Sequence, residues 1–241
     1  MPLSSLELSR YRVMKHLILR PASKKHSPGS LFFGLCLSLA IPFSLAAVPL
    51  PPGSTLLAPP EPDPIGGVVV GGGVPVPFVS GGFSGTLTST VLLGDALNPF
   101  GPGSLTFTYL LVNSPGSADP IDRLTISSFL GVLADGSYQV PTAGLPPTLV
   151  TRNLLGDTVG FTFVGTPIGL GELVPGATSA LMVVQTSASA FAPTFASVIN
   201  GTGASVPSFA PAPVPEPSSL ALFGFALIGL ARWVRSSPRR G

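Results

Sequence analysis

The residues of this chain that could carry out chemistry are mostly carboxylates. The histidines are His16 and His26, the cysteine is Cys36 and the last lysine is Lys25, so no His, Cys or Lys follows residue 46. The rest of the chain therefore cannot form Ser-His-Asp or Cys-His nucleophile systems, lysine Schiff bases, thiolate or imidazole zinc sites, or disulfides. Carboxylate chemistry and oxygen-ligated cations are the classes that remain.

A glycoside hydrolase needs two carboxylates at a defined separation. Acidic residues of the central region could supply such a pair: Asp95, Asp122, Asp135, Asp157 and Glu172. Nothing in their spacing selects a pair. Several Asp residues adjoin Gly or Pro, where Asp commonly accepts hydrogen bonds from backbone amides in turns: Asp95, Asp119, Asp135 and Asp157. We therefore expect these Asp residues to close turns, and we predict no catalytic residue and no cofactor.

Two further polar motifs have simple structural interpretations. Residues 117–122 carry Asp119 and Asp122, which could join a calcium site, but the glycine and glutamate pattern of an EF-hand loop is missing. We expect a turn followed by a surface pair of Asp122 with Arg123, and no metal site. Asn200-Gly201-Thr202 fits a glycosylation sequon, but Asn-Gly is more simply the two-residue turn of a β-hairpin.

The charges segregate along the chain. Residues 47–217 hold two arginines against nine acidic residues, a net charge of −7, whereas both ends of the chain are basic. Binding to a nucleic acid depends on neutralising its phosphates, and a body with two cations cannot do this. We expect no nucleic-acid partner.

The hydrophobic pattern of the central region has a period of two, which is typical of β-strands. In residues 105–112, one face carries Leu105, Phe107, Tyr109 and Leu111, and the other face carries threonines. Further predicted strands, with their inward residues, are 85–93 (Leu87, Val91 and Leu93), 124–130, 159–164 (Val159, Phe161 and Phe163), 180–185 as a central strand, 196–199 and 202–206.

These patterns predict the all-β class. We expect a single antiparallel β-sandwich over residues 83–209, with an immunoglobulin-like arrangement as one alternative. The density of Pro and Gly predicts a linker over residues 47–82, in which Val68 to Val70 could pair as a short edge strand, and an extended linker over residues 210–217.

The N-terminal region has the features of a signal peptide. Lys24 and Lys25 precede an apolar run of about 15 residues that ends in small residues. We predict a signal peptide over residues 1–46, cleaved after Ala46, with Ala47 as the neighbouring choice. A permanent N-terminal anchor is the weaker alternative, because the run is shorter than the ~20 residues that span a bilayer.

The C-terminal region combines an extended motif with an apolar helix. The sequence Val214-Pro215-Glu216-Pro217 precedes a stretch of 12 apolar residues, 220–231, and a cluster of arginines. We predict a short transmembrane helix over residues 218–235 and a basic cytoplasmic tail over residues 236–241. Arg232 and Arg235 would snorkel and Trp233 would lie at the interface.

This arrangement of Pro-Glu-Pro, apolar helix and arginines at the C-terminus resembles the PEP-CTERM sorting signal of bacterial envelope proteins. The resemblance covers about 25 residues. It implies that an exosortase, an integral membrane cysteine transpeptidase, recognises the motif at Val214, Pro215, Glu216 and Pro217 and cleaves the tail during export. It also implies a Gram-negative host that makes exopolysaccharide.

We expect an exported cell-surface or extracellular-matrix protein with a structural or adhesive role, and not an enzyme. Its expected partners are signal peptidase and exosortase, the inner membrane during a transient stage, and exopolysaccharide. One alternative is a polysaccharide-binding module that uses Tyr138, since Tyr109 belongs to the predicted core and few other aromatic residues are placed to bind sugar. The second alternative is a carboxylate-dependent glycan hydrolase.

Overall fold

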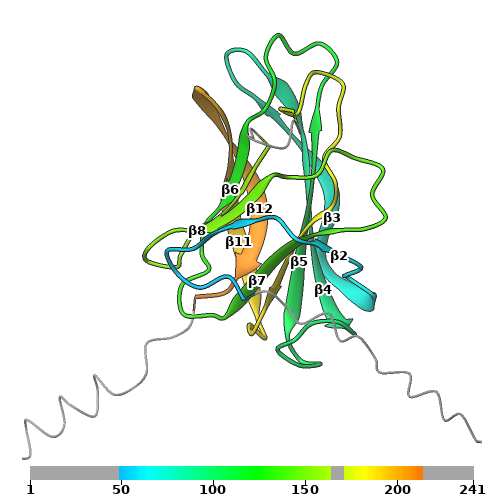
Figure 1. The fold of residues 1–241 in the computed structure, drawn as a ribbon, viewed down its shortest axis with the longest axis vertical. Helices are drawn as coiled ribbons and strands as arrows, with labels where there is room; N and C mark the ends of the chain where they lie inside the picture. The colour runs from blue at the N-terminus through cyan, green and yellow to red at the C-terminus, as the bar shows by residue number, and fades with distance from the viewer. Residues whose placement is uncertain (1–48, 164–170, 214–241) are drawn as a thin grey trace, which may run out of the picture. The chain divides into compact units, whose positions relative to one another are not determined.

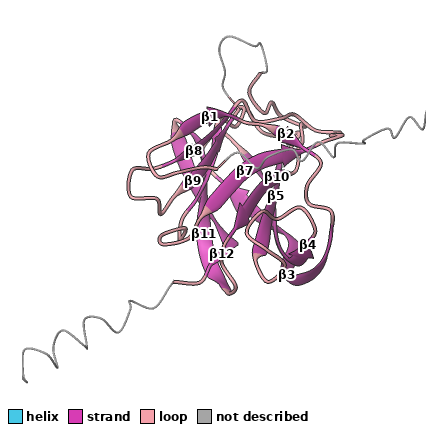
Figure 2. Ribbon diagram, turned by 60° about the horizontal axis from the view of Figure 1, so that its bottom comes forward, coloured by secondary structure: helices cyan, strands magenta, loops and turns pink. Residues whose placement is uncertain are grey.

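The computed structural model describes residues 49–163 and 171–213, and Figure 2 shows that these residues form strands and loops. They contain no helix, and so none that is long and apolar enough to cross a membrane. The strands are β1 (Thr55–Leu57), β2 (Pro60–Glu61), β3 (Gly66–Val79), β4 (Ser84–Asp95), β5 (Leu105–Asn113), β6 (Arg123–Ile126), β7 (Ala134–Gln139), β8 (Leu149–Arg152), β9 (Val159–Thr162), β10 (Met182–Thr186), β11 (Phe191–Asn200) and β12 (Thr202–Pro211).

The strands form two six-stranded sheets (Figure 1). Sheet A has the order β2-β7-β10-β5-β4-β3, and sheet B has the order β1-β8-β9-β6-β11-β12. The all-β prediction is confirmed. The prediction of purely antiparallel sheets is wrong at one edge, because the two-residue strand β2 pairs with β7 in parallel. We call this two-sheet unit the β domain.

One hydrophobic core lies between the two sheets, and β5 shows how it is built. Leu105, Phe107, Tyr109 and Leu111 are all buried in it, as their alternation predicts. The Tyr109 hydroxyl donates a 2.8 Å hydrogen bond to the carbonyl of Phe209 in β12, which links sheet A to sheet B. Burying this large amphipathic ring while satisfying its hydroxyl favours a single packing of the two sheets.

The predicted central strand is confirmed as β10, which lies between β7 and β5 and is buried on both faces. Val159, Phe161 and Phe163 are also buried, as predicted. Leu93 is an exception, since it is 39% exposed. It lies one strand from the sheet edge and pairs with Val68, which is itself exposed, so the core does not extend to this position.

The predicted linker over residues 47–82 is wrong, because this segment contains β1, β2 and β3 and the buried side chain of Leu50. Val68 to Val70 do lie in an edge strand, but that strand is β3 and has 14 residues. An edge strand tolerates Pro and Gly, since Pro75 and Pro77 need not donate to a further strand and glycines fit bulges. The composition of β3 reflects its position at an edge and its irregular register against β4.

Two predicted boundaries also change. The strand expected over residues 124–130 ends at Ile126, close to Ser128, whose φ of +79° does not fit an extended strand. The linker expected from residue 210 begins later, because β12 continues to Pro211, which pairs with Phe191.

The predicted hairpin of β11 and β12 forms, with a different turn. The register pairs Asn200 with Thr202 and Ile199 with Gly203, so the chain reverses around Gly201. A type I′ turn needs positive φ at both central residues. In this hairpin Gly201 has a φ of +61°, and Asn200 is not among the residues with positive φ.

Candidate functional site

The outer face of sheet A carries a group of buried polar side chains near the start of β7. Alternation along β7 turns Gly136 toward Leu50 and Val150 of the core and leaves Asp135 and Ser137 on the outer face. The register places Gln185 of β10 beside Asp135 and beside Thr106 of β5. Residues 61–65 and 95–98 contribute contacts on this face, which explains why Thr106 is buried rather than half-exposed.

Asp95 is the best-connected member of this group. One carboxylate oxygen accepts hydrogen bonds from Thr106 Oγ1 (2.8 Å) and Gln185 Nε2 (2.9 Å). The other oxygen accepts hydrogen bonds from the backbone amides of Ile65 (3.0 Å) and Leu97 (3.1 Å). Asp95 thus closes a turn, as predicted. It also fastens the entry to β3 onto β4, because Ile65 immediately precedes β3.

Three more carboxyl groups, those of Glu61, Asp63 and Asp135, complete this group beside Asp95. Ser137 Oγ donates a hydrogen bond of 3.2 Å to Asp63. Burial, and then the negative charges of Asp135 and Asp63, raise the pKa of Glu61 to about 8. Burial also raises the pKa of Asp63. At neutral pH Glu61 therefore keeps its proton beside two other carboxyl groups. Acid–base enzymes use neighbouring carboxyl groups whose pKa values differ in this way.

The burial of these carboxyl groups argues for a structural role. Glu61, Asp63, Asp95 and Asp135 are each at least nine-tenths buried, and none of them lines the cavities described below. A substrate could not reach them in this conformation. The glycine after Asp135 predicts a turn at this position. Asp135 lies within β7 instead, and Gly136 continues the strand.

The other predicted carboxylates lie apart from this group. Asp157 accepts a short hydrogen bond from the Asn153 side chain, but it is Asn153 Oδ1 that accepts the backbone amides of Asp157 and Thr158 and so holds this turn. Asp119 lies against Gly82, whose carbonyl accepts a hydrogen bond from the Asp119 amide. Asp122 lies near Glu172, because their neighbours Ile121 and Leu173 form a β-bridge. Burial, and then the charge of Glu172, raise the pKa of Asp122.

The predicted surface pair of Asp122 with Arg123 does not form, since Asp122 Oδ1 and Arg123 Nε are each buried without a hydrogen-bond partner. Arg123 instead donates a 2.8 Å hydrogen bond to Thr151 Oγ1 across β9. Residues 49–163 and 171–213 contain no group of three or more His, Cys, Asp or Glu side chains arranged to hold a metal ion.

Arg152 is a buried cation that sequence analysis did not single out. Its guanidinium donates to four backbone carbonyls, listed with their distances: Gly156 (2.9 Å), Leu50 (3.1 Å), Phe129 (2.7 Å) and Val132 (2.8 Å). Burial lowers the pKa of Arg152. These contacts join two loops, 127–133 and 153–158, to the N-terminal segment of the β domain, so the cation organises one end of the fold.

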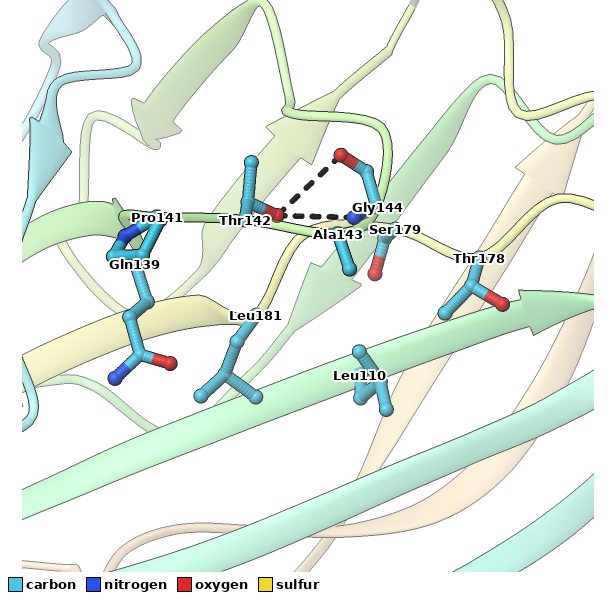
Figure 3. A pocket seen from close by; sticks show the side chains of 9 residues that line it. All are labelled: Leu110, Gln139, Pro141, Thr142, Ala143, Gly144, Thr178, Ser179 and Leu181. Carbon is cyan, nitrogen blue, oxygen red and sulfur yellow. Dashed lines mark hydrogen bonds between the residues drawn. The ribbon is translucent and has the colours of Figure 1, made fainter.

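A groove of about 530 Å³ lies further along the outer face of sheet A. Leu110, Leu181 and Gln139 project into it from neighbouring strands and connections, and residues 141–144 form one wall (Figure 3). Thr142 Oγ1 accepts a 3.1 Å hydrogen bond from the Gly144 amide and so closes this wall. The volume is typical of small-molecule sites, and the lining is uncharged. Half-buried Tyr138 lies on the opposite face of β7 from Gln139.

The most specific finding concerns the residues that follow the β domain. A protein-family comparison matches residues 213–236 to the PEP-CTERM protein-sorting motif. The chain carries a PEP-CTERM sorting signal. This PEP-CTERM motif indicates an exported protein that an exosortase sorts, as the resemblance in the sequence implies. No curated protein and no solved structure matches the chain.

The PEP-CTERM motif begins two residues after the last residue of β12. The predicted sorting residues Val214, Pro215, Glu216 and Pro217 fall within the matched range but outside the described residues. The same holds for Arg232, Trp233 and Arg235. The predicted signal peptide and its cleavage position at Ala46 and Ala47 also lie outside the described residues.

Missed features left weak signals in the sequence. Glu61 and Asp63 are spaced by two, so an extended chain puts both on one face, but the prolines around them favoured the linker interpretation. Arg152 is one of two cations in residues 47–217 and ends a strand of alternating pattern. A lone cation at the end of an apolar strand is a sign of burial or of a binding role.

Proposed function

We propose that this protein is a structural or adhesive component of the cell surface or extracellular matrix, held briefly at the inner membrane by its C-terminal tail and then released by an exosortase. The observation that carries this proposal is the PEP-CTERM motif, which starts directly after a folded β domain. Signal peptidase, exosortase and exopolysaccharide are the partners of this pathway, and the released β domain is the part that would act outside the cell.

The β domain supports a structural role. Its four clustered carboxyl groups are buried and at least two of them hold segments of the fold together. The body of the chain is acidic and lacks Lys, His and Cys after residue 46. We assign no catalytic role, and turnover of a purified exopolysaccharide by the full chain would overturn this part of the proposal.

Intact-mass measurement and fractionation of the native protein from its host test the sorting step. We expect a mature chain that starts near Ala47, ends near Pro215 and lies outside the inner membrane. Glu216→Ala should leave the tail attached, whereas Glu172→Ala, which removes an exposed carboxylate outside the motif, should be processed normally. A wild-type chain that retains Trp233 and is extracted only with detergent would contradict the proposal.

The groove on sheet A favours a second candidate function, binding of a neutral polysaccharide. The aliphatic side chains of Leu110 and Leu181 could contact sugar faces, and Gln139 and Thr178 could hydrogen-bond to hydroxyl groups. Glycan-array binding by the exported chain that is lost in Gln139→Leu would support it. Tyr138→Leu is the comparison, because Tyr138 was the residue expected from sequence and lies on the other face of β7.

A further inference from the structure

The PEP-CTERM tail leaves the β domain at one particular end, which we call the exit end. It consists of the end of β12 and the nearby loops 49–54, 96–104, 127–133, 153–158 and 187–190. The strand register fixes this grouping. Pro211 pairs with Phe191, and Ile126 pairs with both Ala196 and Val159. In Figure 1, β12 runs toward the same end as the connection between β10 and β11.

Hydrogen bonds join the exit-end loops to one another. The Leu105 amide donates to the Ala188 carbonyl (2.8 Å), and the Ala212 amide donates to the Ala190 carbonyl (2.9 Å). The Arg152 guanidinium holds the carbonyls of Phe129 and Val132. The exit end is therefore a connected surface rather than a set of independent loops.

This surface exposes leucines. Leucines of three different loops are all exposed at the exit end: Leu97, Leu130, Leu133, Leu154 and Leu155. Leu154 and Leu155 are 83% and 72% exposed. Between the loops lies an apolar cavity of about 470 Å³, whose lining includes Phe100, Leu133 and Leu155. Leu133 and Leu155 thus meet around one apolar cavity, and exposed apolar surface of this kind on an exported domain marks an interaction site.

The charged residues are distributed unevenly between the two ends of the β domain. The exit-end loops contain one charged residue, Asp157, and the buried Arg152 lies just beneath them. At the opposite end, the described loops carry Asp119, Asp122 and Glu172. The bridge between Ile121 and Leu173 brings the last two together there. The carboxylates next to the exit-end loops, Asp95 and Asp135, are buried, so most of the exposed acidic side chains of the described residues lie at the opposite end.

The segment between the β domain and the predicted membrane helix is short, and its length limits what can cover the leucines. Leu220, the first residue of the apolar stretch within the predicted membrane helix (residues 218–235), follows Pro213 by seven residues. A fully extended chain of this length reaches at most about 25 Å. While the helix is in the membrane, the exit end must remain within that distance of the lipid.

We propose that the exit end docks on the surface of the lipid bilayer while the PEP-CTERM tail is membrane-inserted, with the acidic end pointing away. The docked leucines leave water for the headgroup boundary, as the apolar faces of interfacial helices do, and the nearby carboxylates Asp95 and Asp135 are buried beneath the surface that would meet the lipid. This inference rests on the proposed function in one respect, the insertion of the tail. Docking would hold the β domain in a fixed orientation next to the exosortase.

Nitroxide-lipid quenching tests the orientation in the full chain. The protein, carrying Cys36→Ser, is reconstituted into vesicles of phosphatidylethanolamine and phosphatidylglycerol that contain nitroxide-labelled acyl chains. An environment-sensitive fluorophore is attached at Leu130→Cys in one sample and at Val174→Cys, at the opposite end, in another. We expect strong quenching of the first label and none of the second. Similar quenching of the two labels would overturn the docking proposal.

The single tryptophan separates this result from failure of the proposed function. Trp233 lies in the tail and is the only Trp in the chain, so its quenching reports tail insertion independently. Quenched Trp233 with an unquenched label at position 130 overturns docking and leaves tail insertion intact. Unquenched Trp233 counts against the membrane stage of the proposed function, and an unquenched label at position 130 would still overturn docking.

A matched pair of variants tests the role of the leucines. On the background labelled at position 130, Leu155→Asp adds one charge to the exit end and should weaken docking by about tenfold. Val79→Asp adds one charge at a comparably exposed position, 78% against 72%, toward the opposite end and should have no effect. Equal quenching in the two variants would contradict the proposal.

Discussion

Gln185 donates a 2.9 Å hydrogen bond to Asp95, although 90 residues separate them in the sequence. The bond connects the centre of sheet A to the turn after β4, and the same Asp95 carboxylate binds the amide of Ile65 before β3. An edge strand rich in Gly and Pro gains little stability from its own composition. The buried carboxylate therefore fixes where β3 begins.

Replacing Gln185 with Leu should lower the free energy of unfolding by about 2 kcal/mol, because a buried carboxylate loses one hydrogen-bond donor. Urea denaturation of the purified protein measures this change. Ser205→Ala, at an exposed position of β12, is the control and should change stability by less than about 0.5 kcal/mol. Equal losses in the two variants would mean that the Asp95 contacts do not contribute to stability.

The raised pKa of Glu61, about 8, predicts an unusual dependence of stability on pH. In the unfolded chain this carboxyl group ionises near 4.5. The folded state therefore binds more protons than the unfolded state between these two values, and stability falls as pH rises from about 4.5 to about 8. Asp63, whose pKa is also raised, contributes in the same direction.

Glu61→Gln tests this dependence, since the amide stays neutral at every pH. The variant should be more stable than the parent at pH 8, and its stability should change less between pH 5 and pH 8. Urea denaturation at a series of pH values provides the measurement. Asp119→Asn removes an exposed carboxylate and should leave the slope unchanged. A parent protein whose stability is constant or rises over this range would refute the assignment.

Arg152→Lys should destabilise the β domain by about 3 kcal/mol, because a lysine ammonium cannot reach the four carbonyls that the planar guanidinium binds. Thermal unfolding followed by circular dichroism gives the change in midpoint. Arg123→Lys is the matched control, since Arg123 donates to one side chain, Thr151, and should cost less than about 1 kcal/mol. If both variants lose the same stability, Arg152 does not organise the loops as described.

Strands in which apolar and polar residues alternate could be predicted from the sequence. Burial that depends on contacts with distant segments could not. The alternation of Leu105, Phe107 and Tyr109 was sufficient to place β5, because these three side chains all face the same hydrophobic core. The burial of Thr106 could not be predicted, since it depends on Asp95 and Asn98 folding back over the sheet. The carboxylate group was hidden for the same reason: Glu61 and Asp63, Asp95 and Asp135 come from three separate segments that only the register brings together.

The N-terminal part of the β domain shows a second limit. Its Pro and Gly content was interpreted as a linker, because these residues weaken an isolated strand. In β3 the same residues fit an irregular edge, and Gly72 is the clearest case. Its φ is +73°, and a Cβ atom there would lie 2.0 Å from the carbonyl oxygen of Ser89. Composition alone cannot distinguish a glycine that loosens a chain from one that permits a close backbone approach.

Gly72 and Gly73 separate these two effects experimentally. Both have positive φ, but the nearest atom to a Cβ at Gly73 is Thr90 Oγ1 at 4.0 Å. Gly73→Ala should therefore cost only the conformational strain, about 1 kcal/mol. Gly72→Ala adds a clash with backbone that cannot move without breaking the pairing of β3 with β4, so it should cost about 3 kcal/mol or more.

Urea denaturation of the two variants measures the difference, and hydrogen exchange localises it. We expect amides of β3 to lose protection in Gly72→Ala and to keep it in Gly73→Ala. If the two substitutions have the same small effect on stability and exchange, residues 66–79 tolerate side chains at both positions, and this segment behaves as the linker that its composition predicts rather than as an ordered strand of sheet A.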